Sequence, residues 1–282
     1  MAEFALDGFD LHAFVQSTLA EDLGSGGDIT SAAVIPADAR FIGVMNSRDA
    51  IVVAGLPVAE SFFRALDPDV VIERLVDDGE KVEPGAGLMR LTGKARAMLT
   101  AERSALNTVQ HLSGIATMTR SYVDRIAGTG AILLDTRKTI PGLRVIEKYA
   151  TRMGGAQNHR MRLDDAAMIK DNHVAVAGGV DEAVRRALSA GIAQVIVEVD
   201  AIEQIEPALA AGATRLLLDN MDPSTLARAV ALVNGRVPTE ASGGVRLDTI
   251  RAIAETGVTY ISVGRLTQSA PAADIGLDFS SI

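Results

Sequence analysis

The chain has 282 residues, a net charge of −9 and 48% hydrophobic residues, enough for a large core in one domain or in a large and a small one. The acidic balance excludes a general nucleic-acid or acidic-membrane surface, and the absence of cysteine excludes disulfides, thiolate metal sites and a cysteine nucleophile. No apolar run approaches the roughly 20 residues of a membrane span, and the acidic N-terminus does not resemble a signal peptide. We therefore expect a cytoplasmic protein that binds neither nucleic acid nor membranes.

The first part of the chain predicts a mixed α/β region. An amphipathic helix is expected at 11–23, where Gly24-Ser-Gly-Gly27 ends it, and a second at 57–66 with proline in its first turn. Short strands are expected at 40–45, 50–54 and 70–75. The Gly-rich hairpin of 77–91 is typical of lipoyl and biotinyl carrier domains, but it has no exposed lysine at its tip, which argues against a carrier role.

A long helical pattern follows over 100–127, with a possible break at Gly114. Glu102 and Arg103 lie near its N-terminal end. On the pattern alone, Arg103 is equally well explained as a solvated residue paired with a nearby acid or as part of a site.

From residue 131 onward, short apolar runs alternate with helical patterns. The runs expected to be strands are 132–134, 167–169, 195–197, 216–218, 237–240 and 260–263, and the helices are 180–190, 203–211, 224–233 and 247–255. This alternation indicates a parallel sheet, and the spacing favours an α/β barrel of the TIM type. Six strands are fewer than the usual eight, so the barrel is incomplete or has a further strand. A doubly wound sheet is the alternative, although no GxGxxG opens a helix after the first strand.

Ionisable or small polar residues follow every one of these predicted strands. In chain order they are Asp135, Thr136, Arg137, Lys138, Lys170, Glu198, Asp200, Asp219, Asn220, Glu240, Ser242, Gly243, Gly244, Ser262, Gly264 and Arg265. The active site of a parallel barrel lies at the carboxyl ends of its strands. Because polar residues recur at all six strand ends, a shared site explains them better than six unrelated loops exposed to water.

The stretch from Asp135 to His173 contains eight of the 27 lysine and arginine residues. Cations crowded at strand ends are costly unless solvent or an anionic ligand meets them. Arginine forks suit carboxylates and phosphates, and lysine supplies a movable point charge. Arg137, Lys138, Arg160 and Lys170 therefore predict a pocket for a ligand with several negative charges.

Two carboxylates and two glycine-containing turns narrow the prediction of what this ligand contains. Glu198 and Asp219 could hold Mg²⁺ bound to a diphosphate, accept hydrogen bonds from sugar hydroxyls, or stabilise a developing cation. Ser242-Gly-Gly244 and Gly264 could bind a phosphate, as the last loops of such barrels commonly do. We expect His173 to bond to the backbone, and the histidine spacing excludes a zinc site.

The motifs together resemble the quinolinate phosphoribosyltransferase family. In chain order they are Glu102-Arg-Ser-Ala-Leu-Asn107, Asp135-Thr-Arg-Lys-Thr-Ile-Pro-Gly-Leu-Arg144, Asn158-His-Arg160, Ile169-Lys-Asp-Asn-His173, Leu218-Asp-Asn-Met221 and Glu240-Ala-Ser-Gly-Gly244. The resemblance implies an N-terminal α/β sandwich at 1–115, on which a tail of about 270–282 could pack, and an open TIM-like barrel at 116–269. It also implies Mg²⁺ and conversion of quinolinate and phosphoribosyl pyrophosphate to nicotinate mononucleotide, diphosphate and CO₂.

The resemblance further implies a role for each matching residue. Those assigned to the cationic wall around the two carboxylates of quinolinate are Arg137, Lys138, His159, Arg160 and Lys170. Those assigned to the ribose and metal are Glu198 and Asp219, and those assigned to the rest of the substrate are Thr136, Ser242, Gly243, Gly244, Val263, Gly264 and Arg265. Lys138, Lys170, Glu198 and Asp219 are the expected catalytic residues. Arg103 is expected to reach the site of a neighbouring subunit, which requires at least a homodimer.

Some positions depart from the family pattern, and other functions stay open. Arg265 and Gln268 stand where alanine and histidine are common, and Arg265 could contact a phosphate or make a surface ion pair. A molybdenum-transport-associated paralogue shares much of the pattern. A barrel lyase with Lys170 as a Schiff base and a binding protein without turnover are further alternatives.

Overall fold

The computed structural model describes residues 5–281, which divide into two compact units. Unit 1 comprises the chain up to residue 119, 141–155 and 269 onward, and unit 2 comprises 120–140 and 156–268. Residues 141–155 therefore group with the N-terminal part of the chain, whereas the sequence assigned them to the barrel. Among the described residues, no helix has the length and apolarity to cross a membrane.

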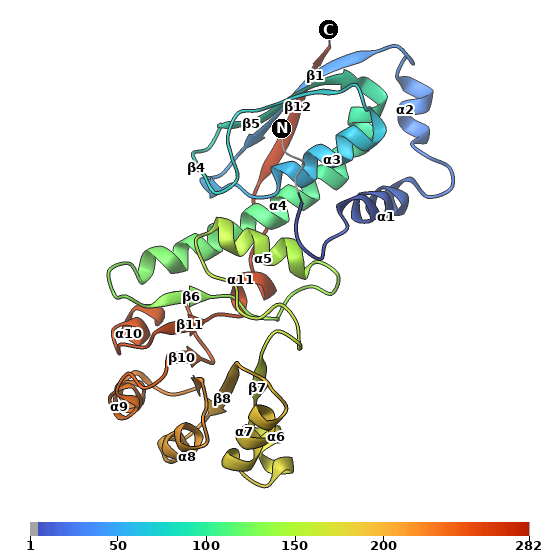
Figure 1. Cartoon of the computed structure of the whole chain (residues 1–282). Coiled ribbons are helices and arrows are strands. Elements are labelled where there is room, and N and C mark those ends of the chain that lie inside the picture. Colours follow the sequence, from blue (N-terminus) through green and yellow to red (C-terminus); the bar gives the residue numbers. More distant parts are fainter. Residues whose placement is uncertain (1–4, 282) are drawn as a thin grey trace. The chain divides into compact units, whose positions relative to one another are not determined.

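Unit 1 is built on an antiparallel sheet. Its strands are β1 (Arg40–Ser47), β3 (Val71–Arg74), β5 (Gly87–Lys94) and β12 (Ile275–Ser281), in the order β12-β1-β5-β3, and β2 (Ile51–Val52) pairs separately with β4 (Lys81–Val82). β12 pairs with β1 from Phe41↔Ser281 to Ser47↔Ile275, so the C-terminal segment is part of this unit (Figure 1).

Helices cover this sheet and complete the core of unit 1. They are α1 (Leu11–Leu23), α2 (Ile29–Val34), α3 (Leu56–Leu66), α4 (Ala95–Arg125) and α5 (Arg144–Met153). The observed α1 has the predicted bounds, and the Asp10 carboxylate caps it by accepting a hydrogen bond from the Ala13 N–H at 2.9 Å. Phe62 and Phe63 of α3 share one buried cluster with Met89 of β5.

Helix α4 continues through Gly114 without the break that the sequence allowed. A Cβ atom at this glycine would lie 2.0 Å from the Pro271 carbonyl oxygen. Gly114 therefore permits close packing between α4 and the segment that leads to β12.

Unit 2 is an open parallel sheet with helices on its outer side (Figure 1). Its strands are β6 (Ile132–Leu134), β7 (Ala167–Ile169), β8 (Val195–Val199), β9 (Arg215–Asp219), β10 (Thr239–Ser242) and β11 (Tyr260–Ser262). Their order is β6-β11-β10-β9-β8-β7, so β6 and β7 form the two ends. Gln157 forms one parallel bridge beside Leu134. The predicted α/β fold with a parallel-sheet second unit is confirmed.

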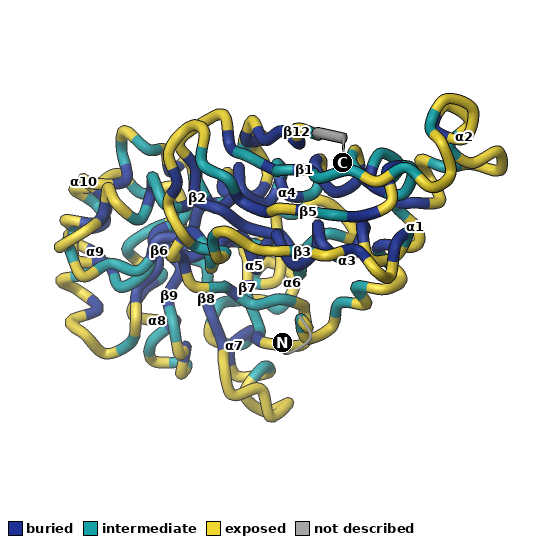
Figure 2. Tube along the Cα trace, turned by 90° about the horizontal axis from the view of Figure 1, so that it is seen from above, coloured by how far each residue is buried: buried dark blue, intermediate teal, exposed yellow. Residues whose placement is uncertain are grey.

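The helices of unit 2 follow its strands from β7 onward, and all except the last lie between two strands of the sheet. They are α6 (Asp171–Ala177), α7 (Val180–Ser189), α8 (Ile205–Ala210), α9 (Pro223–Val233), α10 (Ile250–Ala254) and α11 (Arg265–Gln268). β8 and β9 are buried along most of their length, which explains their continuous apolar sequences (Figure 2). Because all of these strands are parallel, their carboxyl ends bring polar residues that are far apart in the sequence to one edge.

Replacement of Gly114 by alanine tests the close packing on α4. In an exposed helix this change stabilises by about 1 kcal/mol, but a clash with a backbone oxygen should destabilise by about 1–3 kcal/mol. We expect a lower melting temperature for Gly114→Ala, measured by differential scanning calorimetry. Gly26→Ala is the control, because its Cβ meets nothing within 4 Å; equal melting temperatures for the two variants would contradict the packing argument.

Candidate active site

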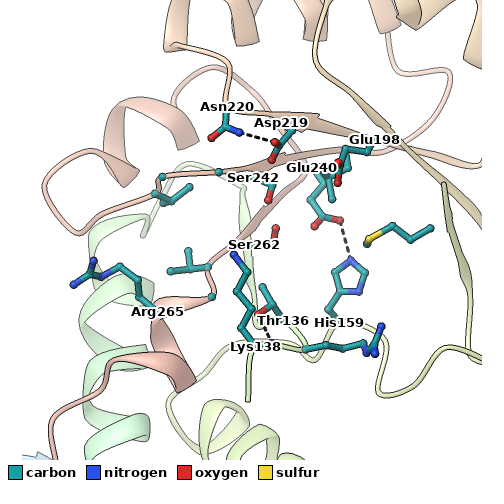
Figure 3. Close-up of a pocket in the computed structure, with 18 of the residues that line it drawn as sticks. Thr136, Lys138, His159, Glu198, Asp219, Asn220, Glu240, Ser242, Ser262 and Arg265 are labelled. Atoms are coloured by element: carbon teal, nitrogen blue, oxygen red, sulfur yellow. Dashed lines mark hydrogen bonds and ion pairs between the residues drawn. The ribbon is translucent and has the colours of Figure 1, made fainter. Parts of the chain in front are cut away.

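A cavity of about 860 Å³ opens at the carboxyl edge of the unit 2 sheet (Figure 3). Of the predicted site residues, those that line it are Thr136, Arg137, Lys138, His159, Arg160, Lys170, Glu198, Asp219, Ser242, Gly243, Gly244, Val263, Gly264 and Arg265. Arg103 does not line it and is exposed on α4. The volume suits a small-molecule ligand.

Two arginines of the pocket lie close enough for their charges to interact unfavourably. Partial burial lowers the pKa of Arg160, and the nearby charge of Arg137 lowers it further. The Arg137 Nε atom is buried without a hydrogen-bond partner, and Arg160 Nη1 donates to the Ala166 carbonyl oxygen at 2.9 Å. An anionic ligand would relieve both the repulsion and the unsatisfied donor.

The loop after β6 holds Lys138 against the pocket. Its backbone N–H donates to Thr136 Oγ1 at 3.0 Å, and its carbonyl oxygen accepts from Thr267 Oγ1 at 2.7 Å. A Cβ atom at Gly264 would lie 2.7 Å from Lys138 Cδ. Gly264 therefore leaves the space that the lysine stem occupies, and the amine reaches into the cavity (Figure 3).

Lys170, just after β7, forms an ion pair with Glu198 of β8. Its Nζ lies 2.6 Å from Glu198 Oε2. The Lys170 N–H donates to His173 Nδ1 at 3.0 Å, which confirms that this histidine bonds to the backbone. A lysine engaged by a carboxylate differs from the desolvated lysines that form Schiff bases.

Asp219, at the end of β9, is supported by a turn from the neighbouring strand. Asn220 Nδ2 donates to Asp219 Oδ2 at 2.6 Å, and the Asn220 N–H donates to the Ser242 carbonyl oxygen at 2.9 Å. Gly243 has a φ of +89°, and a Cβ there would lie 2.1 Å from Asn220 Oδ1. Glycine is thus required where the Ser242 turn packs on Asn220.

Glu198 and Asp219 are the two partly exposed carboxylates of this pocket, and they could hold Mg²⁺. Among residues 5–281, no group of three or more His, Asp or Glu side chains could bind a metal by itself. Mg²⁺ commonly uses one or two protein carboxylates and takes its other ligands from phosphates and water. The pair therefore fits an ion that arrives with a diphosphate better than a resident metal.

Several residues that line the pocket were not assigned to the site from the sequence. They are Met168, Leu217, Asn220, Glu240, Val245, Arg246, Ser262 and Gln268. Asn220, Glu240 and Ser262 were visible as strand-end residues, whereas nothing in the sequence distinguished Met168 and Leu217 from core residues. Within the described residues no ion pair of Arg265 is found, and its side chain is exposed at the rim (Figure 3).

Comparison with known proteins identifies similar chains over nearly the whole length. The C-terminal domain model of quinolinate phosphoribosyl transferase matches residues 115–278, and the N-terminal domain model matches residues 28–113. A nicotinate-nucleotide pyrophosphorylase [carboxylating] of Mycobacterium leprae is 44% identical over 94% of this chain and 95% of its own. A chloroplastic protein of that name from Oryza sativa is 42% identical, over 95% of this chain and 77% of its own.

Solved structures give the same result. The crystal structure of NadC from Streptococcus pyogenes superposes with a TM-score of 0.94 at 36% identity and covers 99% of both chains. The nicotinate-nucleotide pyrophosphorylase from Francisella tularensis superposes with a TM-score of 0.91 at 39% identity, over 96% of both chains.

The charge of the pocket predicts binding of small polyanions. We expect inorganic diphosphate to bind to the wild-type chain and Lys138→Ala to weaken binding at least about tenfold, the value of one lost charge-assisted hydrogen bond. Isothermal titration calorimetry measures this. Arg228→Ala is the matched control, because Arg228 lies on α9 outside the pocket; an equal loss in both variants would show that the binding is not local.

Proposed function

Because the chain belongs to the quinolinate phosphoribosyl transferase family, we propose that it transfers the phosphoribosyl group of phosphoribosyl pyrophosphate to quinolinate. The products are nicotinate mononucleotide, diphosphate and CO₂, so the chain is a pentosyltransferase of NAD biosynthesis. The observation that carries this proposal is that Arg137, Lys138, Arg160 and Lys170 line one cavity with Glu198 and Asp219.

The crowded cations suit the acceptor, which carries two carboxylates. The unsatisfied Arg137 Nε and the charge of Arg160 favour bidentate contacts with a carboxylate. Lys138 and Lys170 add mobile charges beside them. A pocket with so many cations in an acidic protein is poorly explained by an uncharged ligand.

A second group of lining residues suits the sugar donor. Ser242, Gly243, Gly244 and Gly264 expose backbone close to the cavity, where a phosphate can approach. Arg265 lines the same rim and offers a further contact to this phosphate. Val263 adds an apolar surface beside them.

The reaction then needs orientation and charge stabilisation, and no protein nucleophile. The pyridine nitrogen forms a bond to the anomeric carbon while the bond from that carbon to diphosphate breaks. Glu198 and Asp219 can stabilise the positive charge that develops on the ribose. Mg²⁺, held with the diphosphate beside these carboxylates, would supply charge neutralisation for the leaving group.

Loss of CO₂ follows from the product of the first step. The carbon–carbon bond to the carboxylate next to the ring nitrogen breaks, its electron pair stays on the ring, and a proton from water replaces CO₂. The positive ring nitrogen accommodates that electron pair. Lys138 and Arg137 must therefore orient the carboxylates without holding the departing one too tightly.

The other candidate functions make different demands. The Schiff-base lyase requires a free amine, whereas Lys170 is paired with Glu198 at 2.6 Å. A protein that only binds polyanions has no use for two carboxylates in its pocket unless a metal or a sugar contacts Glu198 and Asp219. The molybdenum-transport-associated paralogue differs from the proposed enzyme in substrate, and only turnover of quinolinate distinguishes the two.

A direct assay tests the proposed reaction. With quinolinate, phosphoribosyl pyrophosphate and Mg²⁺, we expect equimolar CO₂ and nicotinate mononucleotide, measured by radiolabelled carboxylate and chromatography. Lys138→Ala and Lys170→Ala should each lower kcat/KM by about 100-fold or more, and chelation of Mg²⁺ should abolish turnover. The Arg228→Ala control should match the wild type. Near-normal kcat/KM in either lysine variant, or borohydride trapping of substrate on Lys170, would refute the assignment.

We propose that Arg103 acts in the pocket of a second subunit, and that the protein works in the cytoplasm as a homodimer or larger assembly. Arg103 is exposed on α4 in a chain whose pocket does not include it. The family resemblance assigns it to a neighbouring site.

Mixed dimers test this arrangement. Arg103→Ala and Lys138→Ala should each be severely impaired, but a dimer with one chain of each contains one site with both residues intact. We expect about half of the wild-type activity in doubly tagged mixed dimers, because each site takes one residue from each chain. Activity no higher than in the single variants would place Arg103 in its own subunit or outside the mechanism.

A further inference from the structure

We propose that Glu240 is a positioning residue, which holds the ring of His159 in one tautomer and thereby fixes Arg160 for the acceptor. The proposal rests on the proposed function, since Arg160 is taken to bind quinolinate. It gives Glu240 and His159 an indirect role in substrate affinity.

Glu240 is fully buried in β10 at the floor of the cavity (Figure 3). Its Oε2 lies 3.2 Å from His159 Nε2 and 3.3 Å from Arg215 Nη1. Burial acts to raise the pKa of this carboxyl, but its contacts hold the pKa below the ordinary value, and the hydrogen bond with His159 is the largest of them. Glu240 is therefore a charged acceptor near neutral pH.

The other ring nitrogen of His159 fixes the tautomer. The Arg160 N–H donates to His159 Nδ1 at 2.7 Å, and only an unprotonated nitrogen can accept that bond. The proton must then lie on Nε2, which points to Glu240. His159 is consequently a neutral ring whose two nitrogens are both engaged. This differs from the expectation that His159 contributes positive charge to the wall around quinolinate.

The same contacts extend to Arg160. Asp135 is buried and accepts from the His159 N–H at 2.8 Å and from Asn158 Nδ2 at 2.6 Å. The segment 158–160 is thus held by Asp135 through the His159 backbone and the Asn158 side chain, and by Glu240 through the His159 ring. Loss of the contact with Glu240 would let the His159 ring turn, which would weaken the hydrogen bond from the Arg160 N–H to Nδ1 and loosen the guanidinium in the pocket.

Arg215 provides a matched control for a purely structural role. It binds the same Glu240 oxygen and stacks on the Tyr260 ring at 4.4 Å from the centroid, but it does not line the cavity. Arg215→Gln removes one partner of Glu240 and leaves the link to His159. If burial of Glu240 mattered only for stability, Arg215→Gln and a Glu240 variant would have similar effects.

Steady-state kinetics of the full chain test the proposal. Leucine cannot accept a hydrogen bond, so Glu240→Leu should raise the KM for quinolinate at least about tenfold, because small misplacements cost this much, and leave the KM for phosphoribosyl pyrophosphate within about twofold. Glu240→Gln should restore most of the affinity, since its amide oxygen can accept from His159. Arg215→Gln should leave both KM values near those of the wild type.

His159→Leu removes the other partner of the contact between His159 and Glu240. This second variant keeps the test valid if Glu240→Leu does not fold. It should reproduce the rise in KM for quinolinate, and the double variant should be no worse than either single one. Nitrogen-15 NMR of labelled histidine should show a proton on Nε2 of His159 in the wild type. Additive effects, equal changes in both KM values, or a proton on Nδ1 would overturn the proposal. An inactive wild type would instead refute the proposed function.

Discussion

Repulsion between basic groups at one edge of a parallel sheet is the constraint that the rest of the site satisfies. The nearby charge of Arg137 adds to partial burial in lowering the pKa of Arg160, and the Arg137 Nε atom is buried without a hydrogen-bond partner. Glu198 neutralises one of the positive charges by pairing with Lys170. The positive charges that are left favour a ligand with several negative charges, so the free pocket is organised for binding before the substrate arrives.

Buried carboxylates and glycine residues around these cations give the pocket its rigidity. Asp135 and Glu240 are both fully buried. Asp135 accepts a hydrogen bond from the backbone N–H of His159, and Glu240 lies within hydrogen-bond distance of the His159 ring. Glycines 243 and 264 leave space for Asn220 and Lys138. The buried carboxylates and the glycines thus hold the cationic side chains in place. Such a fixed arrangement agrees with an enzyme that acts mainly by orienting its substrates.

The sequence predicted the strands of unit 2 and most of the pocket, because apolar runs followed by polar residues mark strand ends. It did not predict α5, whose short charged sequence lacks a capping signal, nor its grouping with unit 1. It also placed His159 in a cationic wall, whereas we propose a neutral ring. That proposal depends on contacts with the Arg160 N–H and with Glu240, 81 positions from His159 along the chain, and no local pattern encodes the contact with Glu240. The family resemblance supplied the roles, whereas the hydrogen-bond geometry required the structure.

The number of carboxylates on the acceptor provides the most direct test of the central claim. If the cationic wall binds both carboxylates of quinolinate, nicotinate should leave buried donors unpaired. The ratio of kcat/KM for quinolinate to that for nicotinate, measured with phosphoribosyl pyrophosphate and Mg²⁺, should then be about 10⁴ or more. A ratio near one would contradict a pocket built to bind two carboxylates.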